Sequence, residues 1–397
     1  MTKKILPFIT VCLLLSGAVS NANSAPPRLG VWITVFSRQQ VLHSSQNMQK
    51  LVNLCEVLGV TDIYLQVYRS DQAYYDSSIT DRGPFENVIR SAGEDLIPHL
   101  IKKAGERNIK VHAWINVLSL AHNREANIIK KFGEDVLTFD QIGRPSMGPA
   151  ASGDELDKRY ARENQLFLEP GDWRVRGYIG DIAEEILARY PGLAGLHLDY
   201  IRYPATTPYI PGARFTSHGI SYGYNRMNLL NFTEHTGIDP QEITSSRSNS
   251  MLWDKWRRDQ VTRLTSYIAE RARKTLPTVE ISATVMPSLE KTYFATFQDW
   301  TKWLEKGIVD SVIVMNYTDD TRLMGLYSSA IMALDKQNRT QIGIGAYLMK
   351  DDTAEVMEQI TLLKNLSPSG IVIFSYDDLA DNTQLKQFLA ENFSKIQ

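Results

Sequence analysis

The chain has 397 residues, of which 43% are hydrophobic and 22% charged, and its formal net charge at pH 7 is −2. This composition is ordinary for a globular protein, and the length suits one large α/β barrel with long loops. The near-neutral charge gives no electrostatic argument for binding nucleic acid or an anionic membrane, so neither is expected as a partner.

The first 22 residues have the pattern of a signal peptide. Two lysines precede an apolar run at residues 5–19, and small residues stand at positions 20 and 22. We expect cleavage after Ala22 and export to the periplasm or the extracellular space. The residues before Cys12 match a lipid-attachment box poorly, so an anchored lipoprotein is the less favoured alternative. No later segment is apolar over a length that would cross a membrane.

Eight short apolar runs alternate with helical patterns through the rest of the chain. The runs are rich in β-branched and aromatic residues, and several are apolar on both faces, as buried parallel strands are. They cover residues 29–35, 62–67, 110–117, 194–200, 279–285, 311–317, 341–347 and 370–376. Apolar residues at helical spacing recur at 97–107, 173–190, 297–306, 326–336, 353–366 and 383–392.

This alternation predicts a (β/α)₈ TIM barrel formed by one domain, residues 28–397. An open doubly wound sheet is the alternative, but no glycine-rich turn follows the first run. Two long insertions, residues 121–168 and 205–250, follow the third and fourth strands. Both are strand-to-helix connections, so we expect them at the C-terminal end of the barrel, where active sites of this fold lie.

Asp199 is the most informative acid, because it stands at the end of the buried run Gly195-Leu196-His197-Leu198-Asp199. A carboxylate in that position is costly unless it is paired or used in chemistry. Glu169, before the helix that leads into the fourth strand, and Asp319, after the sixth, are expected at a similar height. Two such acids on one rim would supply the carboxylate pair of glycoside hydrolysis.

Polar and aromatic residues are also expected to gather at this rim. Side chains alternate along a strand, so residues two apart share a face, as His197 and Asp199 do. Aromatic rings stack on the apolar faces of sugars, and Arg202 could lower the pKa of Asp199 or hold a substrate carboxylate. The predicted substrate-binding residues are Tyr68, His112, Trp114, Asn116, His197, Arg202, Tyr317 and Tyr376.

Metal-dependent hydrolysis is the rival chemistry. His112, His197 and Asp199 lie on adjacent predicted strands and could form a three-ligand set. The sequence has no His-x-His pair and no cysteine cluster, so no metal or other cofactor is expected.

Seven segments together resemble a bacterial glycosyl-hydrolase-like (β/α)₈ family, formerly classed as a domain of unknown function. They are residues 28–32, 64–68, 111–116, 168–178, 195–204, 315–317 and 373–376. Members of this family include an enzyme that cuts peptide-free peptidoglycan glycan strands. The resemblance implies an exported glycoside hydrolase that acts on a cell-envelope or extracellular polysaccharide, with Asp199 as the rim carboxylate.

The chain departs from the family pattern at two positions. Glu169 stands where the family usually has aspartate, and Tyr200 follows Asp199 where a second acid is frequent. These departures keep a second hypothesis open, namely a barrel that binds glycans without cleaving them.

Overall fold

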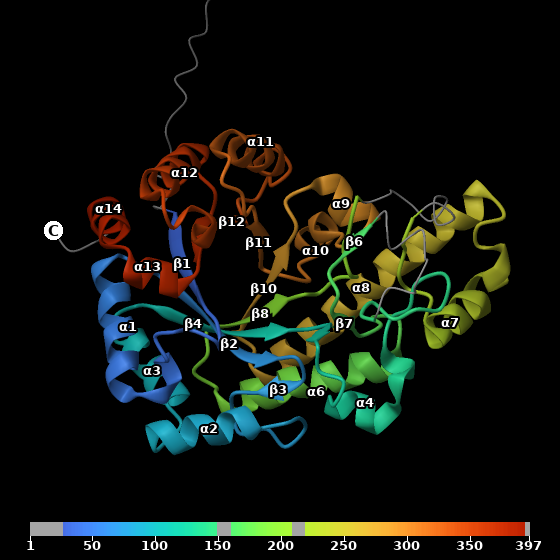
Figure 1. The fold of residues 1–397 in the computed structure, drawn as a ribbon, viewed down its shortest axis with the longest axis horizontal. Coiled ribbons are helices and arrows are strands. Elements are labelled where there is room, and N and C mark those ends of the chain that lie inside the picture. Colours follow the sequence, from blue (N-terminus) through green and yellow to red (C-terminus); the bar gives the residue numbers. More distant parts are fainter. Residues whose placement is uncertain (1–26, 149–159, 209–218, 394–397) are drawn as a thin grey trace, which may run out of the picture.

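A computed structural model describes residues 27–148, 160–208 and 219–393, which build a barrel of parallel strands (Figure 1). The eight strands follow one another around the barrel in chain order, and β1 closes it by pairing with both β2 and β13. Their bounds are β1 Arg28–Ile33, β2 Asp62–Arg69, β4 Lys110–Asn116, β8 Gly195–Asp199, β10 Glu280–Val285, β11 Ser311–Met315, β12 Thr340–Gly345 and β13 Gly370–Phe374. Each predicted run overlaps one strand, so the (β/α)₈ prediction is confirmed and the open sheet is wrong.

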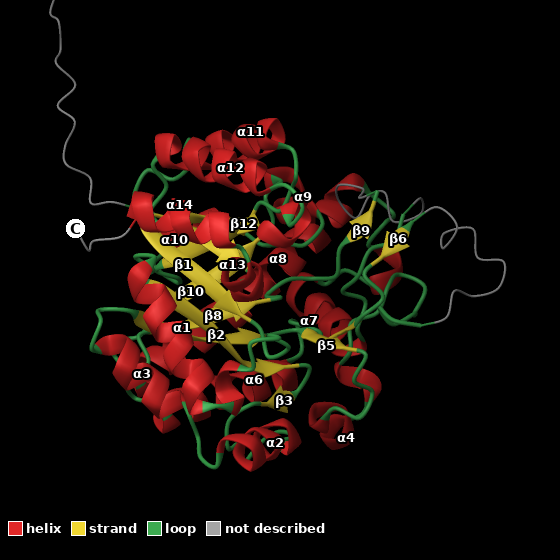
Figure 2. Cartoon of the chain, turned by 60° about the vertical axis from the view of Figure 1, so that its left-hand side comes forward, coloured by secondary structure: helices red, strands yellow, loops and turns green. Residues whose placement is uncertain are grey.

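Helices surround the strands on the outside (Figure 2). They are α1 Ser45–Val57, α2 Gly83–Ala92, α3 Ile97–Gly105, α6 Trp173–Arg189, α8 Arg247–Thr275, α9 Leu289–Phe294, α10 Trp300–Glu305, α11 Thr321–Met332, α12 Thr353–Leu366, α13 Tyr376–Asp381 and α14 Thr383–Phe393, with short 3₁₀ turns at Val41–His43 and Ala346–Met349. Helix α11 begins five residues before its predicted start, because Asp320 caps it by accepting a hydrogen bond from the Leu323 backbone N–H (3.0 Å).

Helix α8 is long, yet its apolar pattern is weak. It packs against α6 on one side and carries buried polar residues, among them Arg257 and Gln260, toward the second insertion. A helix covered on several faces does not need the single apolar stripe that marks an ordinary surface helix.

The two insertions are joined into one lobe at the C-terminal end of the barrel. The first contains β5 Ser119–Ala121, α4 Asn127–Phe132, the 3₁₀ turn Glu134–Val136, β6 Ala161–Arg162 and β7 Leu166–Phe167, and the second contains β9 Thr206–Thr207, α7 Arg226–Thr236 and the 3₁₀ turn Pro240–Glu242. A short hairpin strand, β3 Gln72–Ala73, extends β2. β6 pairs with β9, and Asp140 forms a bridge with Tyr222, so segments more than 40 residues apart in the chain become neighbours.

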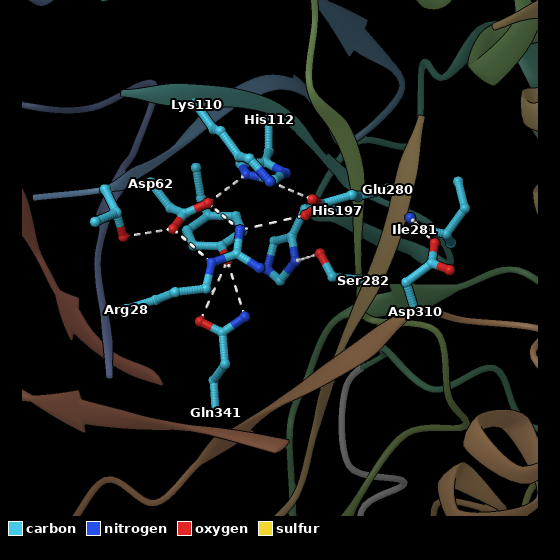
Figure 3. A network of polar contacts seen from close by, with 12 residues as sticks. Arg28, Asp62, Lys110, His112, His197, Glu280, Ile281, Ser282, Asp310 and Gln341 are labelled. Carbon is cyan, nitrogen blue, oxygen red and sulfur yellow. Dashed lines mark hydrogen bonds and ion pairs between the residues drawn. The ribbon is translucent and has the colours of Figure 1, made fainter. Parts of the chain in front are cut away.

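The opposite, N-terminal end of the barrel is closed by charged side chains (Figure 3). Arg28 donates from Nε to Asp62 Oδ2 (2.8 Å), and His112 Nε2 contacts Asp62 Oδ1 (2.8 Å). Glu280 forms ion pairs with Arg28 (3.2 Å) and Lys110. Burial would raise the pKa of Asp62, but the hydrogen bonds and charges of His112 and Arg28 outweigh it and hold that pKa well below the ordinary value.

The predicted signal peptide, residues 1–22, and Cys12 within it lie outside the described residues. Among the residues that are described, no helix combines the length and the apolar character needed to cross a membrane.

Candidate active site

A cavity of about 560 Å³ opens at the C-terminal ends of the barrel strands. All eight strands, or the residues that directly follow them, contribute to its wall. The lining residues are Trp32, Thr34, Phe36, Gln66, Arg69, Trp114, Asn116, Gln165, Asp199, Tyr200, Arg202, Thr284, Met286, Pro287, Met315, Tyr317, Tyr347 and Phe374. Of the lining residues in the described ranges, only Asp199 carries a carboxylate.

Asp199 is the last residue of β8, and its carboxylate is held by three donors. Thr284 Oγ1 (2.6 Å) and the Tyr200 backbone N–H (2.7 Å) donate to Oδ1, and Trp114 Nε1 donates to Oδ2 (3.1 Å). Tyr200 reaches this position with a left-handed backbone, φ 52°. The carboxylate is therefore fixed from three separate segments of the chain.

The environment of Asp199 raises its pKa above the ordinary value for aspartate. Burial is the largest cause, because it disfavours the charged form. The three hydrogen bonds and the positive charge of Arg202 act in the opposite direction without cancelling the burial. A carboxyl of this kind is suited to deliver a proton, because it stays protonated to higher pH than a solvated aspartate.

Aromatic rings form much of the cavity wall. Tyr317 stacks on Phe374 with ring centroids 5.6 Å apart, and Tyr347 meets Tyr317 edge to face at 6.2 Å. Trp32 lies edge-on to both Tyr317 and Phe374. Such a wall offers flat apolar surfaces that fit the faces of sugar rings.

Two amides and a guanidinium add directional polar groups. Gln66 accepts from the Val35 backbone N–H (3.2 Å) and donates to Asn116 Oδ1 (3.0 Å), which orients the Asn116 amide. Arg202 is ion-paired with Glu163 (2.8 Å), and its guanidinium lies 4.9 Å from the Tyr200 ring centroid. These groups are held in place before any ligand binds.

The structure brings five of the predicted site residues to one cavity: Asp199, Trp114, Asn116, Arg202 and Tyr317. Their catalytic and substrate-binding roles stay predictions, because position alone does not test a role. The other predicted residues lie outside the cavity lining: Glu169, Asp319, His112, His197, Tyr68 and Tyr376.

Glu169 is buried outside the cavity lining. It accepts hydrogen bonds from Tyr203 Oη (2.5 Å), Thr138 Oγ1 (2.8 Å) and the Gly171 backbone N–H (3.0 Å). Burial raises its pKa to about 7, although the three donors oppose that shift. Its carboxyl thus joins the two insertions instead of facing the cavity. Asp319, the other predicted partner, is exposed in the loop after β11 and also lies outside the lining.

The two histidines lie deeper in the barrel than expected. The Trp32 indole N–H donates to His197 Nε2 (3.0 Å), and His197 Nδ1 contacts Ser282 Oγ (2.8 Å). Burial, followed by the charge of His112, lowers the pKa of His197 well below its ordinary value. The neutral ring therefore carries its proton on Nδ1 and supports Trp32 from below.

His112 belongs to the charged network at the N-terminal end (Figure 3). Because His112 and His197 are occupied by these partners, the metal-ligand set with Asp199 is not formed. Among the described residues, no cluster of three or more His, Cys, Asp or Glu side chains could hold a metal ion.

Tyr68 and Tyr376 also lie away from the cavity. The register of β2 against β4 shifts between Gln66 and Tyr68, so the regular alternation breaks and Tyr68 hydrogen-bonds Asp71 (3.1 Å) outside the lining. Tyr376 is the first residue of α13 and is buried near Cys55 of α1.

Sequence reasoning missed several lining residues, among them Thr284, Phe36, Arg69 and Gln165. Thr284 could have been found, because Ser282 and Thr284 are polar residues two apart in an otherwise apolar strand. Gln165 could not, because its position depends on the pairing of β5 with β7.

Comparison with known proteins agrees with this architecture. The model of the glycosyl hydrolase-like 10 family matches residues 28–348. "Glycosyl hydrolase YngK" of Bacillus subtilis (strain 168) is 23% identical over 92% of this chain and 71% of its own length. "Glycosyl hydrolase DigH" of Escherichia coli O6:H1 is 20% identical, over 90% of this chain and 84% of its own length.

Two solved structures share the fold at low sequence identity. The PgaB (BpsB) glycoside hydrolase domain from Bordetella bronchiseptica has a TM-score of 0.68 and 14% identity, and the match covers 94% of this chain and 100% of that one. The catalytic domain of β-amylase from Paenibacillus polymyxa has a TM-score of 0.57 and 13% identity, with 93% and 98% covered. The family match spans most of the chain, and the resemblance noted in the sequence is confirmed: the chain belongs to the glycosyl hydrolase-like 10 family, as an enzyme of the glycoside hydrolase class.

Proposed function

We propose that this glycoside hydrolase is exported and cleaves a polysaccharide of the cell envelope or extracellular space, with Asp199 as its general acid. One observation carries the proposal: a buried carboxyl with a raised pKa lies in a cavity walled by aromatic rings at the C-terminal end of the barrel. In this role Asp199 protonates the glycosidic oxygen as its bond to the anomeric carbon breaks. A water molecule forms the new bond to that carbon and gives up a proton, so one water is consumed for each bond cleaved. Peptide-free peptidoglycan glycan strands are the first substrate to test, because the sequence resembles a family with a member that cuts them.

The other groups of the cavity have roles that follow from their chemistry. Trp114 orients Asp199 and, with Tyr317, offers a face for a sugar ring. Asn116 has its carbonyl oxygen occupied by Gln66, so its amide N–H groups are left to donate to a substrate hydroxyl or carbonyl.

The test is Asp199→Asn, which keeps the shape of the side chain and removes its proton-donating function. We expect kcat on glycan strands to fall by at least about 100-fold, as removal of a general acid does, while KM changes little. Product analysis by liquid chromatography and mass spectrometry measures the cleavage. The matched control is Asp319→Asn, an exposed acid outside the cavity, for which we expect activity within about twofold of the parent. An Asp199→Asn chain that keeps more than a tenth of the activity would contradict the assignment.

A glycan-binding barrel without hydrolysis is the second candidate, and one observation favours it. Among the described lining residues there is one carboxylate, whereas hydrolysis of a glycosidic bond commonly uses two. Calorimetric binding of glycan strands with no product formed by the parent chain would establish this candidate instead.

Export is tested separately. N-terminal sequencing of the protein recovered from expressing bacteria is expected to begin at Asn23, after cleavage at Ala22. A chain that retains residues 1–22 in the cytoplasm would contradict export without bearing on the role of Asp199.

A further inference from the structure

A second hollow, of about 420 Å³, is lined by residues of α6, α7 and α8. These three helices lie outside the barrel strands (Figure 1). It shares no lining residue with the cavity that contains Asp199. We call it the α6–α8 groove, and it is lined by Trp173, Arg176, Asn231, Glu234, His235, Trp256, Gln260 and Arg263.

Two tryptophans give the groove flat apolar surface. Trp173, the first residue of α6, is 60% exposed, which is unusual for so large an apolar side chain with no structural task. Trp256 of α8 is held rigidly, because its indole N–H donates to Asn228 Oδ1 (2.8 Å) and its ring lies 5.4 Å from that of His235. Trp256 is only 7% exposed and already contacts Arg263 and His235, so Trp173 is the ring that offers an open face to a sugar.

Two arginines bring positive charge to the same groove. The guanidinium of Arg263 lies 5.4 Å from the Trp256 ring centroid, and Arg176 is half-buried on the facing helix. Burial and the neighbouring charge of Arg263 lower the pKa of Arg176. Within the described ranges neither arginine forms an ion pair. Asp172, at the start of α6, is paired with Arg174 (2.7 Å), and its charge offsets only part of the lowering of the Arg176 pKa.

One acid, Glu234, also lines the groove, so the two arginines leave it with a net positive charge. Glu234 and His235 are exposed on α7, and neither forms an ion pair with Arg176 or Arg263. Two facing guanidinium groups without a carboxylate partner repel each other, and an anion bound between them would relieve that repulsion. Guanidinium groups bind carboxylates through paired, directional hydrogen bonds.

We propose that the α6–α8 groove is a second binding site, for an acidic saccharide whose ring stacks on Trp173 and whose carboxylate is bound by Arg176 and Arg263. The proposal rests on the proposed function in one respect: the saccharide would belong to the same polysaccharide that the barrel cavity cleaves. A site outside the barrel would hold a long strand while the cavity acts on it, and it would restrict binding to glycans that carry carboxylates.

Calorimetry tests the groove without any turnover. The probes are peptide-free peptidoglycan glycan strands, in which alternate sugars carry a lactyl carboxylate, and the same strands with those carboxyls amidated. In the Asp199→Asn background, Arg176→Gln with Arg263→Gln is expected to weaken binding of the intact strands by about tenfold or more and to leave the amidated strands unaffected. Trp173→Ala is expected to weaken the binding of both probes. Because Trp173 is exposed, its replacement should leave the fold intact.

The matched control is Arg322→Gln, which replaces an exposed arginine of α11 that does not line the groove. We expect it to leave the binding of both probes unchanged. A kinetic measurement gives the second readout: with Asp199 intact, the groove variants are expected to raise KM for long strands and leave kcat, and all constants for a tetrasaccharide, unchanged. Isotherms identical to the parent for both groove variants would overturn the proposal, and equal binding of intact and amidated strands would overturn its acidic specificity. Strand binding at the groove with full activity in Asp199→Asn would instead overturn the proposed catalytic role alone.

Discussion

Trp114 contributes both to the cavity wall and to the environment of the proposed acid, Asp199. Its ring lines the cavity, and its indole N–H donates to Asp199 Oδ2 (3.1 Å). That hydrogen bond favours the ionised carboxylate, so it moderates the rise in pKa that burial causes. Removing the donor and keeping an aromatic ring separates the two contributions.

Trp114→Phe is therefore expected to raise the pKa of Asp199 further, because the variant lacks the indole donor that favours the ionised carboxylate. If the protonated form of Asp199 is the active one, as proposed, the alkaline limb of the kcat–pH profile should move to higher pH. The profile on glycan strands measures this. Trp300→Phe, a buried tryptophan of α10 outside the cavity, serves as control and should leave the limb in place; an unmoved limb in Trp114→Phe would show that another group is the acid.

Glu169 connects elements of the chain through buried hydrogen bonds, and its predicted catalytic role stays a prediction. It directly follows the first insertion, and two of its three donors are Thr138 in that insertion and Tyr203, just before the second. Tyr203 and Thr138 are further linked to Asn228 and Gly223 of the second insertion. The carboxyl of Glu169 is thus one of several contacts that hold the lobe together, beside the pairing of β6 with β9 and the bridge between Asp140 and Tyr222.

Glu169→Ala leaves three buried donors without an acceptor, and we expect it to lower the free energy of unfolding by about 3 kcal/mol. Glu169→Gln keeps two acceptor contacts and should cost less than about 1 kcal/mol at pH 5. Urea unfolding measures both. If Glu169 were a catalytic carboxylate, Glu169→Gln would lose 100-fold or more in kcat, whereas we expect a change within about threefold.

The free energy of unfolding should depend on pH differently in the parent and in Glu169→Gln. The pKa of Glu169 is about 7 in the folded protein and about 4.3 in an unfolded chain. Between these values the folded state binds more protons, so the stability of the parent should fall as pH rises from about 4 to about 7. This contribution should be missing in Glu169→Gln, and an identical pH dependence in both chains would contradict a buried, proton-binding Glu169.

At the scale of the whole molecule, the two ends of the barrel have separate tasks. The C-terminal end carries the cavity, and the N-terminal end is closed by the ion pairs of Arg28, Asp62, Lys110 and Glu280 with His112 (Figure 3). Asp62 is fully buried and Arg28 is 30% exposed at its side chain. Removing one partner of such a pair leaves a buried charge without compensation.

Asp62→Asn is expected to lower the free energy of unfolding at pH 7 by about 3 kcal/mol. Because the folded pKa of Asp62 lies below the unfolded value of about 3.9, its contribution is complete above about pH 5 and is lost as the pH falls further. The variant should therefore show a shallower loss of stability in acid. Glu56→Gln, which breaks an exposed pair with Arg107 (2.8 Å), is the control and should cost less than about 0.5 kcal/mol.

Sequence reasoning reached most of the framework and about half of the candidate site. Strand positions and the inward face of Asp199, Trp114 and Asn116 follow from side-chain alternation, which is local. Alternation failed at Tyr68, because a register shift in β2 turns the side chain away, and nothing in the residues around it marks that shift. Alternation also did not predict how deep His112 and His197 lie in the barrel. The inward face of a strand runs from the charged network at the N-terminal end to the cavity at the C-terminal end, and alternation does not distinguish positions along it.

The order of eight strands, the C-terminal placement of both insertions and the presence of Asp199 at a strand end were determined by the sequence alone. They depend on the spacing of apolar residues along the chain and on chain direction, both of which can be read from short segments. Only the tertiary structure decided which acids face the cavity, that Glu169 joins the two insertions, and that Trp173, Arg176, Trp256 and Arg263 share a groove. These placements depend on the pairing of β6 with β9 and on the packing of α6, α7 and α8. Contacts between distant segments arise from the balance of many packing interactions, and no short sequence pattern encodes them.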